Sequence, residues 1–390
     1  MTELIDHVAA IGRPLKRKED ARLLTGKTQW TDNIQLAGAL HMAILRSPMG
    51  HAKITKLDVS GALKYPGVEA AYGADELGDL NGSVPCVWPV TDDMVAPDFP
   101  ALAKGEVRHM GDCVALVLAG TAAQAADALE GIVVEYSALP AVIDMDEAIK
   151  DGSPLVHSDK GTNKCYTYKL QPQGDGAYEA AKAKADVVVK RRFVNQRLIP
   201  AFMEPRAVVA SPMGTSGELT IWSATQVPHV LRVLLALVTG VSENKLRVVA
   251  PDVGGGFGGK LQCYREEILC VALANKRGRP IKWTETRSED MMATHHGRDQ
   301  LQDIEVAATK DGKLLGLKVD LIANMGAYLQ IITPGIPLLG MFMYPAIYKM
   351  DAYDFSCIGV FTNTTPTDAY RGAGRPESTY AIERIMDELA

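Results

Sequence analysis

The chain has 390 residues, of which 47 % are hydrophobic and 23 % are charged, and it contains 35 glycines. This length exceeds one compact core of ordinary size and the composition excludes a disordered or fibrous protein, so we expect two domains, or one domain with a large appendage. The 41 basic and 47 acidic residues give a formal charge of −6, which argues against nucleic acid as a partner because no basic stripe is available.

Targeting and membrane signals are not predicted. Residues 1–18 contain no apolar run of signal-peptide length, and no segment approaches the roughly 20 apolar residues that cross a bilayer. The six cysteines lie far apart and lack the CxxC spacing that holds zinc or an iron–sulfur cluster; they are Cys86, Cys113, Cys165, Cys263, Cys270 and Cys357. We therefore expect reduced thiols, no membrane insertion and a cytoplasmic location.

A small α/β domain is predicted after a polar, basic arm over residues 1–25. Four segments have the alternation or apolar character of strands, and one alanine-rich segment is typical of a helix. In chain order they are strands at 39–45, 52–57 and 114–119, a helix at 121–130 and a strand at 131–136. We place this domain at 26–145. Prolines and glycines punctuate the polar stretch that follows, so residues 146–184 are expected to be a linker.

A larger unit is predicted over residues 185–390. Its strands are expected at 186–193, 219–223, 246–250, 302–308 and 314–323, the last two forming a hairpin at Asp311-Gly312. Its clearest helix ends at Gly240 and has one apolar face, made of Val227, Val230, Leu231, Leu234, Leu235 and Val238. Further helices are expected at 264–275 and 378–390. The last leaves Met386 and Leu389 without an evident partner, which predicts an incomplete domain.

A glycine-rich loop, Gly254-Gly255-Gly256-Phe257-Gly258-Gly259-Lys260, is the most informative segment. So many glycines allow backbone N–H groups to approach a bulky anionic ligand closely. The spacing also satisfies the GxGxxG fingerprint of dinucleotide-binding folds, between a predicted strand and a predicted helix. That fold needs an acidic residue about 20 positions further on, and the nearest candidate, Glu285, comes late. A glycine-rich turn that only permits close packing is a third interpretation.

Residues 252–260 closely resemble the molybdopterin-contacting loop in the large subunits of xanthine oxidase, aldehyde oxidase and aerobic carbon monoxide dehydrogenase. Further motifs of that family occur in the same order along nearly the whole chain. They lie at residues 12–14, 19–26, 46–48, 51–54, 111–115, 134–136, 139–142, 203–206, 223–229 and 369–377. The resemblance implies an α/β (α+β) fold, with an a/b-hammerhead domain at 26–145 and an incomplete first half of a molybdopterin-binding domain at 185–390.

The resemblance also implies a molybdenum hydroxylase. In this family the metal is held through the dithiolene of a pterin, with no protein side chain as a metal ligand, and a substrate carbon is hydroxylated with oxygen from water. The protein contributes binding, orientation and electrostatics to the cofactor. The implied cofactor is molybdenum bound to molybdopterin cytosine dinucleotide. The 2Fe-2S clusters and FAD that receive the electrons are expected on partner subunits, since this chain has no CxxC cluster.

Three residues are assigned catalytic roles by the resemblance. Gln226 would lie beside the metal and donate a hydrogen bond to one of its oxygen ligands. Phe257 would pack near the substrate, and Arg371 would hold substrate or pterin oxygens through paired donors. The implied cofactor-binding residues are Gln226, Gly255, Gly256, Phe257, Gly258, Arg371, Gly372 and Ala373. His229 is expected to be structural, and Lys260 to face solvent or a phosphate.

Two departures from family patterns narrow the substrate. Carbon monoxide dehydrogenases place a copper-binding cysteine directly after the arginine of the second loop, where this chain has Gly372. Purine-oxidising members place a glutamate directly after the lysine of the glycine loop, where this chain has Leu261. An aldehyde or an N-heterocycle is therefore expected as the small-molecule substrate.

Family members continue for about as many residues again, and that second half holds the glutamate that acts as general base. We expect as partners the C-terminal half of a large subunit or a complementary chain, an FAD-binding medium subunit and a 2Fe-2S small subunit, without which hydroxylation is not expected. Two alternatives remain open. One is a non-catalytic assembly half that docks its complementary chain, and the other is an oxidoreductase that binds NAD through the glycine loop.

Overall fold

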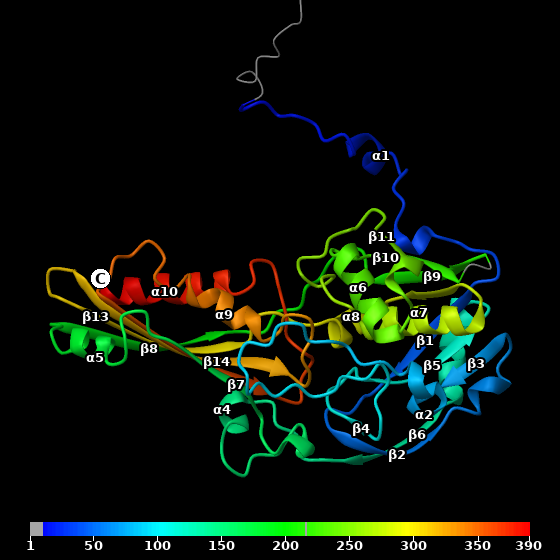
Figure 1. The fold of residues 1–390 in the computed structure, drawn as a ribbon, viewed down its shortest axis with the longest axis horizontal. Coiled ribbons are helices and arrows are strands. Elements are labelled where there is room, and N and C mark those ends of the chain that lie inside the picture. The colour runs from blue at the N-terminus through cyan, green and yellow to red at the C-terminus, as the bar shows by residue number, and fades with distance from the viewer. Residues whose placement is uncertain (1–10, 215–216) are drawn as a thin grey trace, which may run out of the picture.

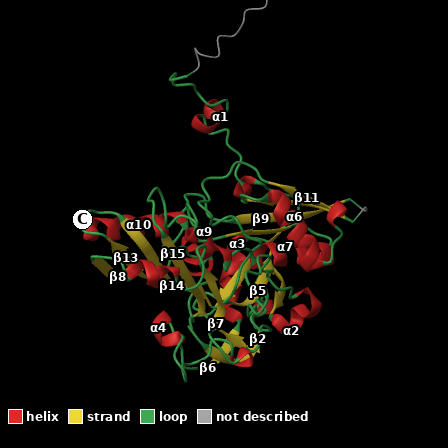
Figure 2. Cartoon of the chain, turned by 60° about the vertical axis from the view of Figure 1, so that its left-hand side comes forward, coloured by secondary structure: helices red, strands yellow, loops and turns green. Residues whose placement is uncertain are grey.

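The computed structural model describes residues 11–214 and 217–390, so the first ten residues of the predicted arm lie outside the described residues. Within the described part, the strands form three sheets, which lie in two lobes joined side by side (Figure 1). The described part of the arm, with α1 (Asp20–Leu24), projects away from both lobes in Figures 1 and 2. Arg22 of α1 forms an ion pair with Asp252.

One lobe is built on a five-stranded sheet in the order β7-β15-β14-β13-β8. The strands are β7 (Lys164–Leu170), β15 (Ala352–Phe361), β14 (Leu314–Gly326), β13 (Gln300–Ala308) and β8 (Val187–Asn195). The predicted hairpin is confirmed, because β13 and β14 pair antiparallel across the turn at Gly312, whose φ is +82°. α9 (Gly335–Met341) and α10 (Arg375–Leu389) pack against each other, and α10 also contacts β8 and β13.

The other lobe is built on a seven-stranded sheet in the order β11-β10-β9-β12-β1-β5-β3. Its strands are β11 (Leu246–Val249), β10 (Glu218–Ser223), β9 (Ala207–Met213), β12 (Ile281–Thr284), β1 (Leu40–Arg46), β5 (Cys113–Ala119) and β3 (Val68–Tyr72). All seven residues of β5 are buried, as expected for an uninterrupted apolar run in a sheet interior. β1 and β12 pair in parallel, so this sheet crosses the expected boundary between the two domains.

A three-stranded antiparallel sheet completes that lobe, in the order β4-β2-β6. It consists of β4 (Glu106–Val107), β2 (Ala52–Asp58) and β6 (Val133–Ala138). α2 (Ala74–Leu77) follows β3, and α3 (Ala122–Ala128) packs on β1 and β5. The predicted strand–helix–strand order over 114–136 is confirmed, with Thr121 capping α3 by accepting a hydrogen bond from the N–H of Gln124.

Two longer helices pack against each other and on the β11-to-β12 part of the seven-stranded sheet. α6 (Pro228–Thr239) ends at Gly240, whose φ of +70° confirms the predicted cap. Leu231, Leu234 and Leu235 of its predicted apolar face are buried, but Val230 is 43 % exposed and was wrongly placed on that face. α7 (Arg265–Arg277) packs on β9 and β12, and α8 (Arg287–Ala293) follows β12.

Three expectations are corrected by the structure. Residues 146–184, expected to be a linker, contain β7 and α5 (Ala177–Lys182), with α4 (Met145–Ala148) overlapping their start, because β7 pairs with β15 as an edge of the five-stranded sheet. β9 was not predicted at all, although it pairs with both β10 and β12. Met386 and Leu389, expected to lack a partner, are partly buried and pack against the main hydrophobic core.

Candidate functional site

The glycine loop lies between β11 and α7, and its backbone is shaped for close approach. Gly255, Phe257 and Gly258 have φ of +92°, +52° and +98°, in the left-handed region that side chains disfavour. A Cβ on Gly256 would lie 2.3 Å from Gln226 Oε1, and a Cβ on Gly258 would lie 2.0 Å from the carbonyl oxygen of Ala369. Packing therefore favours glycine at both positions, and at Gly258 the left-handed backbone angle favours it as well.

The loop presents N–H groups that the protein itself leaves without partners. Within the described residues, no acceptor bonds the N–H of Gly255, Gly256 or Phe257, although Gly256 is buried. Successive N–H groups in left-handed backbone form concavities that bind anions or oxygen-rich ligands. Buried N–H groups are almost always paired in native proteins, so the loop fits a ligand rich in acceptors.

The amide of Gln226 is oriented by the same loop. Its Oε1 accepts hydrogen bonds from the N–H of Gly258 at 2.9 Å and of Lys260 at 3.3 Å. Because both neighbours are donors, the oxygen must face them, which settles the orientation of the amide. None of the described residues accepts a hydrogen bond from the Gln226 NH₂ group, and Gln226 is exposed. The side chain therefore keeps two donors available at the loop.

Lys260 was expected to face solvent or a phosphate, and that expectation is wrong. Its Nζ lies 2.7 Å from Glu204 Oε2 and its side chain is fully buried, above the ring of Phe202. Glu204 Oε2 also accepts the N–H of Gly254 at 2.7 Å, so one carboxylate fixes both ends of the glycine loop. Burial lowers the pKa of Lys260, and the neighbouring Glu204 opposes that shift.

A second loop, between β15 and α10, contacts the first. The N–H of Arg371 donates to the carbonyl oxygen of Phe257 at 2.8 Å, and the guanidinium carbon of Arg371 lies 5.6 Å from the Phe257 ring centroid. Gly372, Ala373 and Gly374 have φ of +112°, +44° and +82°. Phe257 is 42 % exposed and Arg371 is exposed, so both side chains are free to contact a ligand.

The two loops come from different lobes, and the structure thus brings the predicted site residues together. Gln226 and the glycine loop follow strands of the seven-stranded sheet, whereas Arg371, Gly372 and Ala373 follow the five-stranded sheet. His229 is apart from this contact, exposed in the first turn of α6. The site is therefore a junction between lobes (Figure 1).

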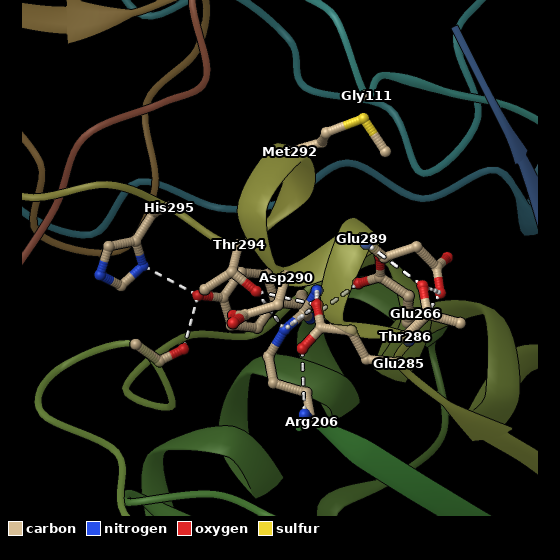
Figure 3. A network of polar contacts seen from close by, with 12 residues as sticks. Gly111, Arg206, Glu266, Glu285, Thr286, Glu289, Asp290, Met292, Thr294 and His295 are labelled. Carbon is tan, nitrogen blue, oxygen red and sulfur yellow. Dashed lines mark hydrogen bonds and ion pairs between the residues drawn. The ribbon is translucent and has the colours of Figure 1, made fainter. Parts of the chain in front are cut away.

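A buried charge network supports the glycine-loop side of this junction (Figure 3). The Arg206 guanidinium bonds Glu285 at 2.6 Å and Glu266 at 3.0 Å, and its Nε donates to Thr294 at 2.8 Å. Glu266 also pairs with Arg46 at 2.8 Å. Burial raises the pKa of Glu266 on its own, but the surrounding arginines outweigh it and hold that pKa well below its usual range.

The same network engages Glu285, the acidic residue that the dinucleotide-binding interpretation would need. Glu285 is buried, and both of its carboxylate oxygens accept hydrogen bonds from Arg206, so it is not placed to bind a ribose. In addition, α7 begins at Arg265 and not directly after Gly259, whereas the fingerprint requires a helix N-terminus at the glycine loop. The glycine loop therefore lacks two features of an NAD site.

Several residues at the junction were not predicted to act there. Glu204 lies in a matched motif, at residues 203–206, and that motif was the available signal for it. Tyr264, whose hydroxyl donates to Gly259 O at 2.7 Å and lies 2.9 Å from His295 Nδ1, had no sequence signal. His295 Nε2 in turn donates to Ala369 O at 2.9 Å, which links the two loops through buried groups.

Comparisons with known proteins give the family. Residues 156–390 match the molybdopterin cofactor-binding domain, and residues 25–140 match the a/b hammerhead domain of aldehyde oxidase and xanthine dehydrogenase. The chain belongs to the xanthine oxidase and aldehyde oxidase family. The α/β fold with hammerhead and molybdopterin-binding regions is thereby confirmed, and the family is one of molybdenum-dependent oxidoreductases.

Relatives within the family are named for different substrates. The carbon monoxide dehydrogenase large chain of Hydrogenophaga pseudoflava is 37 % identical over 96 % of this chain and 47 % of its own length. The nicotine 6-hydroxylase large subunit of Paenarthrobacter nicotinovorans is 32 % identical over 97 % of this chain and 46 % of its own. The chain spans about half the length of these curated relatives.

Solved structures agree with the fold. Quinoline 2-oxidoreductase from Pseudomonas putida 86 superposes with a TM-score of 0.88 at 33 % identity, covering 92 % of this chain and 45 % of that one. Within the described residues, no helix is long and apolar enough to span a bilayer. Nor do those residues contain a group of three or more His, Cys, Asp or Glu side chains placed to hold a metal ion.

Proposed function

We propose that the chain is part of the large subunit of a molybdenum hydroxylase and provides one wall of its cofactor and substrate site. The observation that carries this proposal is the contact between the two loops, where unpartnered N–H groups of Gly255, Gly256 and Phe257 lie beside the free NH₂ group of Gln226. When bound, a molybdenum–pterin cofactor would supply the oxidation of a substrate carbon with oxygen from water.

The chain's own residues would bind and orient the cofactor. The Gln226 NH₂ group would donate to an oxygen of the cofactor without adding charge, and the free N–H groups of Gly255, Gly256 and Phe257 would line the cofactor, with the backbone of Gly258 beside them. Gly258 already bonds Gln226, so its part is to hold that amide in place. Gly372 and Ala373 would complete the lining from the second loop.

Substrate contacts would come from Phe257 and Arg371. The half-exposed ring of Phe257 offers an apolar face, and the guanidinium of Arg371 above it offers paired donors. An aromatic N-heterocycle or an aldehyde could contact the apolar ring of Phe257 and accept hydrogen bonds from Arg371. Leu261, where purine-oxidising members have a glutamate, supports a less polar substrate. Relatives named for nicotine, 6-hydroxypseudooxynicotine and quinoline support the N-heterocycle class.

Carbon monoxide is not the proposed substrate, although two similar relatives are carbon monoxide dehydrogenases. Gly372 occupies the position where those enzymes are expected to have their copper-binding cysteine. The backbone also opposes a side chain there, since φ of Gly372 is +112° and a Cβ would lie 2.5 Å from Pro376 Cγ. A thiolate at this position would need a different loop conformation.

The proposed enzyme is heteromeric and cytoplasmic. Further pterin contacts and the general-base glutamate would come from the C-terminal half of the large subunit or from a complementary chain. The large molybdopterin subunit of nicotinate dehydrogenase from Eubacterium barkeri supports a separate chain, since the match covers 85 % of its length at 28 % identity. The cofactor would be the cytosine dinucleotide form, and electrons would leave to 2Fe-2S and FAD subunits.

The decisive experiment is molybdenum content by elemental mass spectrometry on the natively purified protein, with the copurifying proteins identified in the same sample. Near-stoichiometric molybdenum with a flavoprotein and an iron–sulfur protein is expected. No molybdenum despite a full set of partners would contradict the proposal, and a non-catalytic assembly half would replace it.

A matched substitution tests the role of Gln226. Gln226→Glu keeps an oxygen for the N–H groups of Gly258 and Lys260 but removes the NH₂ donors. Turnover of the holoenzyme is expected to fall about 10²–10³-fold, the usual loss for one preorganised donor, with the fold retained. His229→Gln, exposed in the first turn of the following helix α6, serves as the control and should leave turnover unchanged. Equal rates for wild type and Gln226→Glu would remove Gln226 from the catalytic set.

A further inference from the structure

We infer that Arg298 is a positioning residue that sets the conformation of the Arg371 loop. The inference rests on the proposed function only in one respect, namely that this loop is proposed to contact the cofactor and the substrate. Arg298 lies between α8 and β13, outside every sequence motif noted above. Its Nη1 donates to the carbonyl oxygen of Tyr370 and its Nη2 to that of Arg371, each at 3.0 Å. One guanidinium thus holds two consecutive carbonyls.

The charge of Arg298 is balanced within the same assembly. Its Nη1 lies 2.9 Å from Oε1 of Glu377, in the first turn of α10, and the side chains are 8 % and 1 % exposed. Its guanidinium carbon also lies 4.9 Å from the ring centroid of Tyr370. Because Arg371 adds a second positive charge to this loop, a buried carboxylate beside Arg298 reduces the repulsion between the two guanidinium groups.

The backbone around Arg298 is shaped for this contact. Arg298 and Asp299 both have left-handed φ, +65° and +63°, which side chains rarely adopt and which must be held by surrounding contacts. Asp299 supplies some of them, since Arg197 Nε donates to its carboxylate at 2.7 Å and Asn324 at 3.0 Å. A Cβ on Gly297 would lie 2.2 Å from Tyr370 Cβ, so glycine allows the loop to approach.

As a result, the carbonyl oxygens of the loop are occupied by donors while some of its N–H groups stay without partners in the described part of the chain. Four consecutive carbonyl oxygens accept side-chain hydrogen bonds; these are Ala369 from His295, Tyr370 and Arg371 from Arg298, and Gly372 from Arg375. Among the described residues, nothing accepts the N–H of Gly372 or Gly374. With its carbonyls held in this way, the loop has N–H groups and the Arg371 side chain left to offer a ligand. Arg298 supplies two of the four bonds, and its fork geometry can do so where a lysine cannot.

The test uses hydrogen–deuterium exchange on the natively purified protein with its copurifying partners. Arg298→Lys keeps the positive charge for Glu377 but loses the fork onto two carbonyls. The N–H groups of Arg371, Ala373 and Arg375, which are hydrogen-bonded in the loop, are expected to exchange about tenfold faster in this variant. Exchange in β13 and β14 should stay unchanged, which a general loss of folding would not allow.

A control of the same chemistry is available in the same lobe. Arg192 of β8 forks onto Asp303 at 2.6–3.2 Å, and Arg192→Lys should leave exchange in residues 369–377 at the wild-type rate. If Arg298→Lys does not fold, the pair Arg298→Gln with Glu377→Gln removes both charges together and should still speed exchange in the loop. Wild-type exchange there in either folded Arg298 variant, or equal acceleration in Arg192→Lys, would overturn the inference.

Molybdenum content of the same samples separates the inference from the proposed function. If wild-type protein holds no molybdenum but Arg298→Lys still speeds loop exchange, the role of Arg298 stands and the cofactor proposal fails. If molybdenum is present and loop exchange is unchanged in Arg298→Lys, the cofactor proposal stands and the role of Arg298 fails. When the cofactor proposal and the role of Arg298 are both correct, Arg298→Lys is expected to bind several-fold less molybdenum than Arg192→Lys.

Discussion

Gly258 shows most directly how a single residue permits the site. Its φ of +98° is unfavourable for a side chain, and a Cβ would lie 2.0 Å from Ala369 O and 2.7 Å from Ala369 C, both backbone atoms of the second loop. Neither atom can move without displacing Arg371, which is hydrogen-bonded to Phe257. The closeness of the two loops therefore depends on the missing side chain at this position.

We predict that Gly258→Ala destabilises the protein more than its backbone angle alone explains. The matched control is Gly278→Ala, at the end of α7, where φ is +65° and a Cβ would meet nothing within 4 Å. The control should lose about 1 kcal/mol, the cost of the left-handed angle. Gly258→Ala should lose about 3 kcal/mol or more, because the clash adds to that cost. Urea unfolding measures both, and equal losses would show that the loops tolerate separation.

At the residue scale, the motifs predicted which side chains lie together at the contact between the two loops, but not how they are held. Gln226, Phe257 and Arg371 lie together as expected, although their roles remain proposals. Lys260 was misjudged because its partner, Glu204, lies 2.7 Å away in space but in a different motif. Arg298 left no sequence signal, since its role depends on carbonyl groups more than 70 positions away, which every residue type carries.

Among the elements, α7 is unusual in burying three charged residues in its first turn. Arg265, Glu266 and Glu267 are all buried, and the two glutamates respond in opposite ways. Arginines hold the pKa of Glu266 low, whereas burial raises the pKa of Glu267 to about 7. Ser223 and the N–H of Tyr264 bond Glu267 at 2.6 and 2.8 Å without overcoming that burial.

Glu267 should make stability fall as the pH rises. Its folded pKa of about 7 exceeds the unfolded value of about 4.3, so the folded state binds more protons between them and loses stability as the pH rises through this window. The cost at pH 8 is on the order of 3 kcal/mol. Glu267→Gln should therefore gain stability relative to wild type between pH 5 and pH 8, measured by urea unfolding.

Glu266→Gln is the matched control for that experiment. Glu266 has a lowered pKa, so it is ionised in both folded and unfolded states throughout pH 5–8 and adds little pH dependence there. Its replacement leaves Arg46 and Arg206 short of a buried partner and should cost about 3–5 kcal/mol at every pH in that range. A similar pH slope for wild type and Glu267→Gln would show that Glu267 is not the titrating group.

Elements with strong local patterns were predicted, and those defined by distant partners were not. The β13–β14 hairpin, α6 and α7 have periodicity, turn residues or caps within their own sequence. β7 alternates only weakly and becomes a strand because β15 lies beside it. β9 has an apolar run, but Pro205 lies two residues before it and Pro212 lies within it, so its position between β10 and β12 could not be inferred locally.

For the molecule as a whole, the arrangement of the sheets was the least predictable property. Two successive domains were expected, yet β1 from the first and β12 from the second are neighbours in one sheet, with Leu40 opposite Ile281. No local pattern encodes a parallel pairing across such a separation. The matched motifs gave the family without giving this pairing.

A fragment experiment tests how far the two parts depend on each other. Without β12, β1 becomes an edge strand with the apolar sequence LHMAILR, so residues 26–145 alone should aggregate. The whole chain, in which β12 covers this edge, should be more soluble than the fragment in a sedimentation assay. A monomeric, folded 26–145 fragment would contradict this dependence.

The β1–β12 pairing also has a consequence for biosynthesis. A ribosome adds about 5–20 residues per second, so β1 would wait on the order of tens of seconds for its neighbour to emerge. During that interval the nascent chain carries an open, apolar strand edge, and its high contact order slows the closing step. Production of this protein should therefore respond to slower translation and to chaperone supply more strongly than its final stability would suggest.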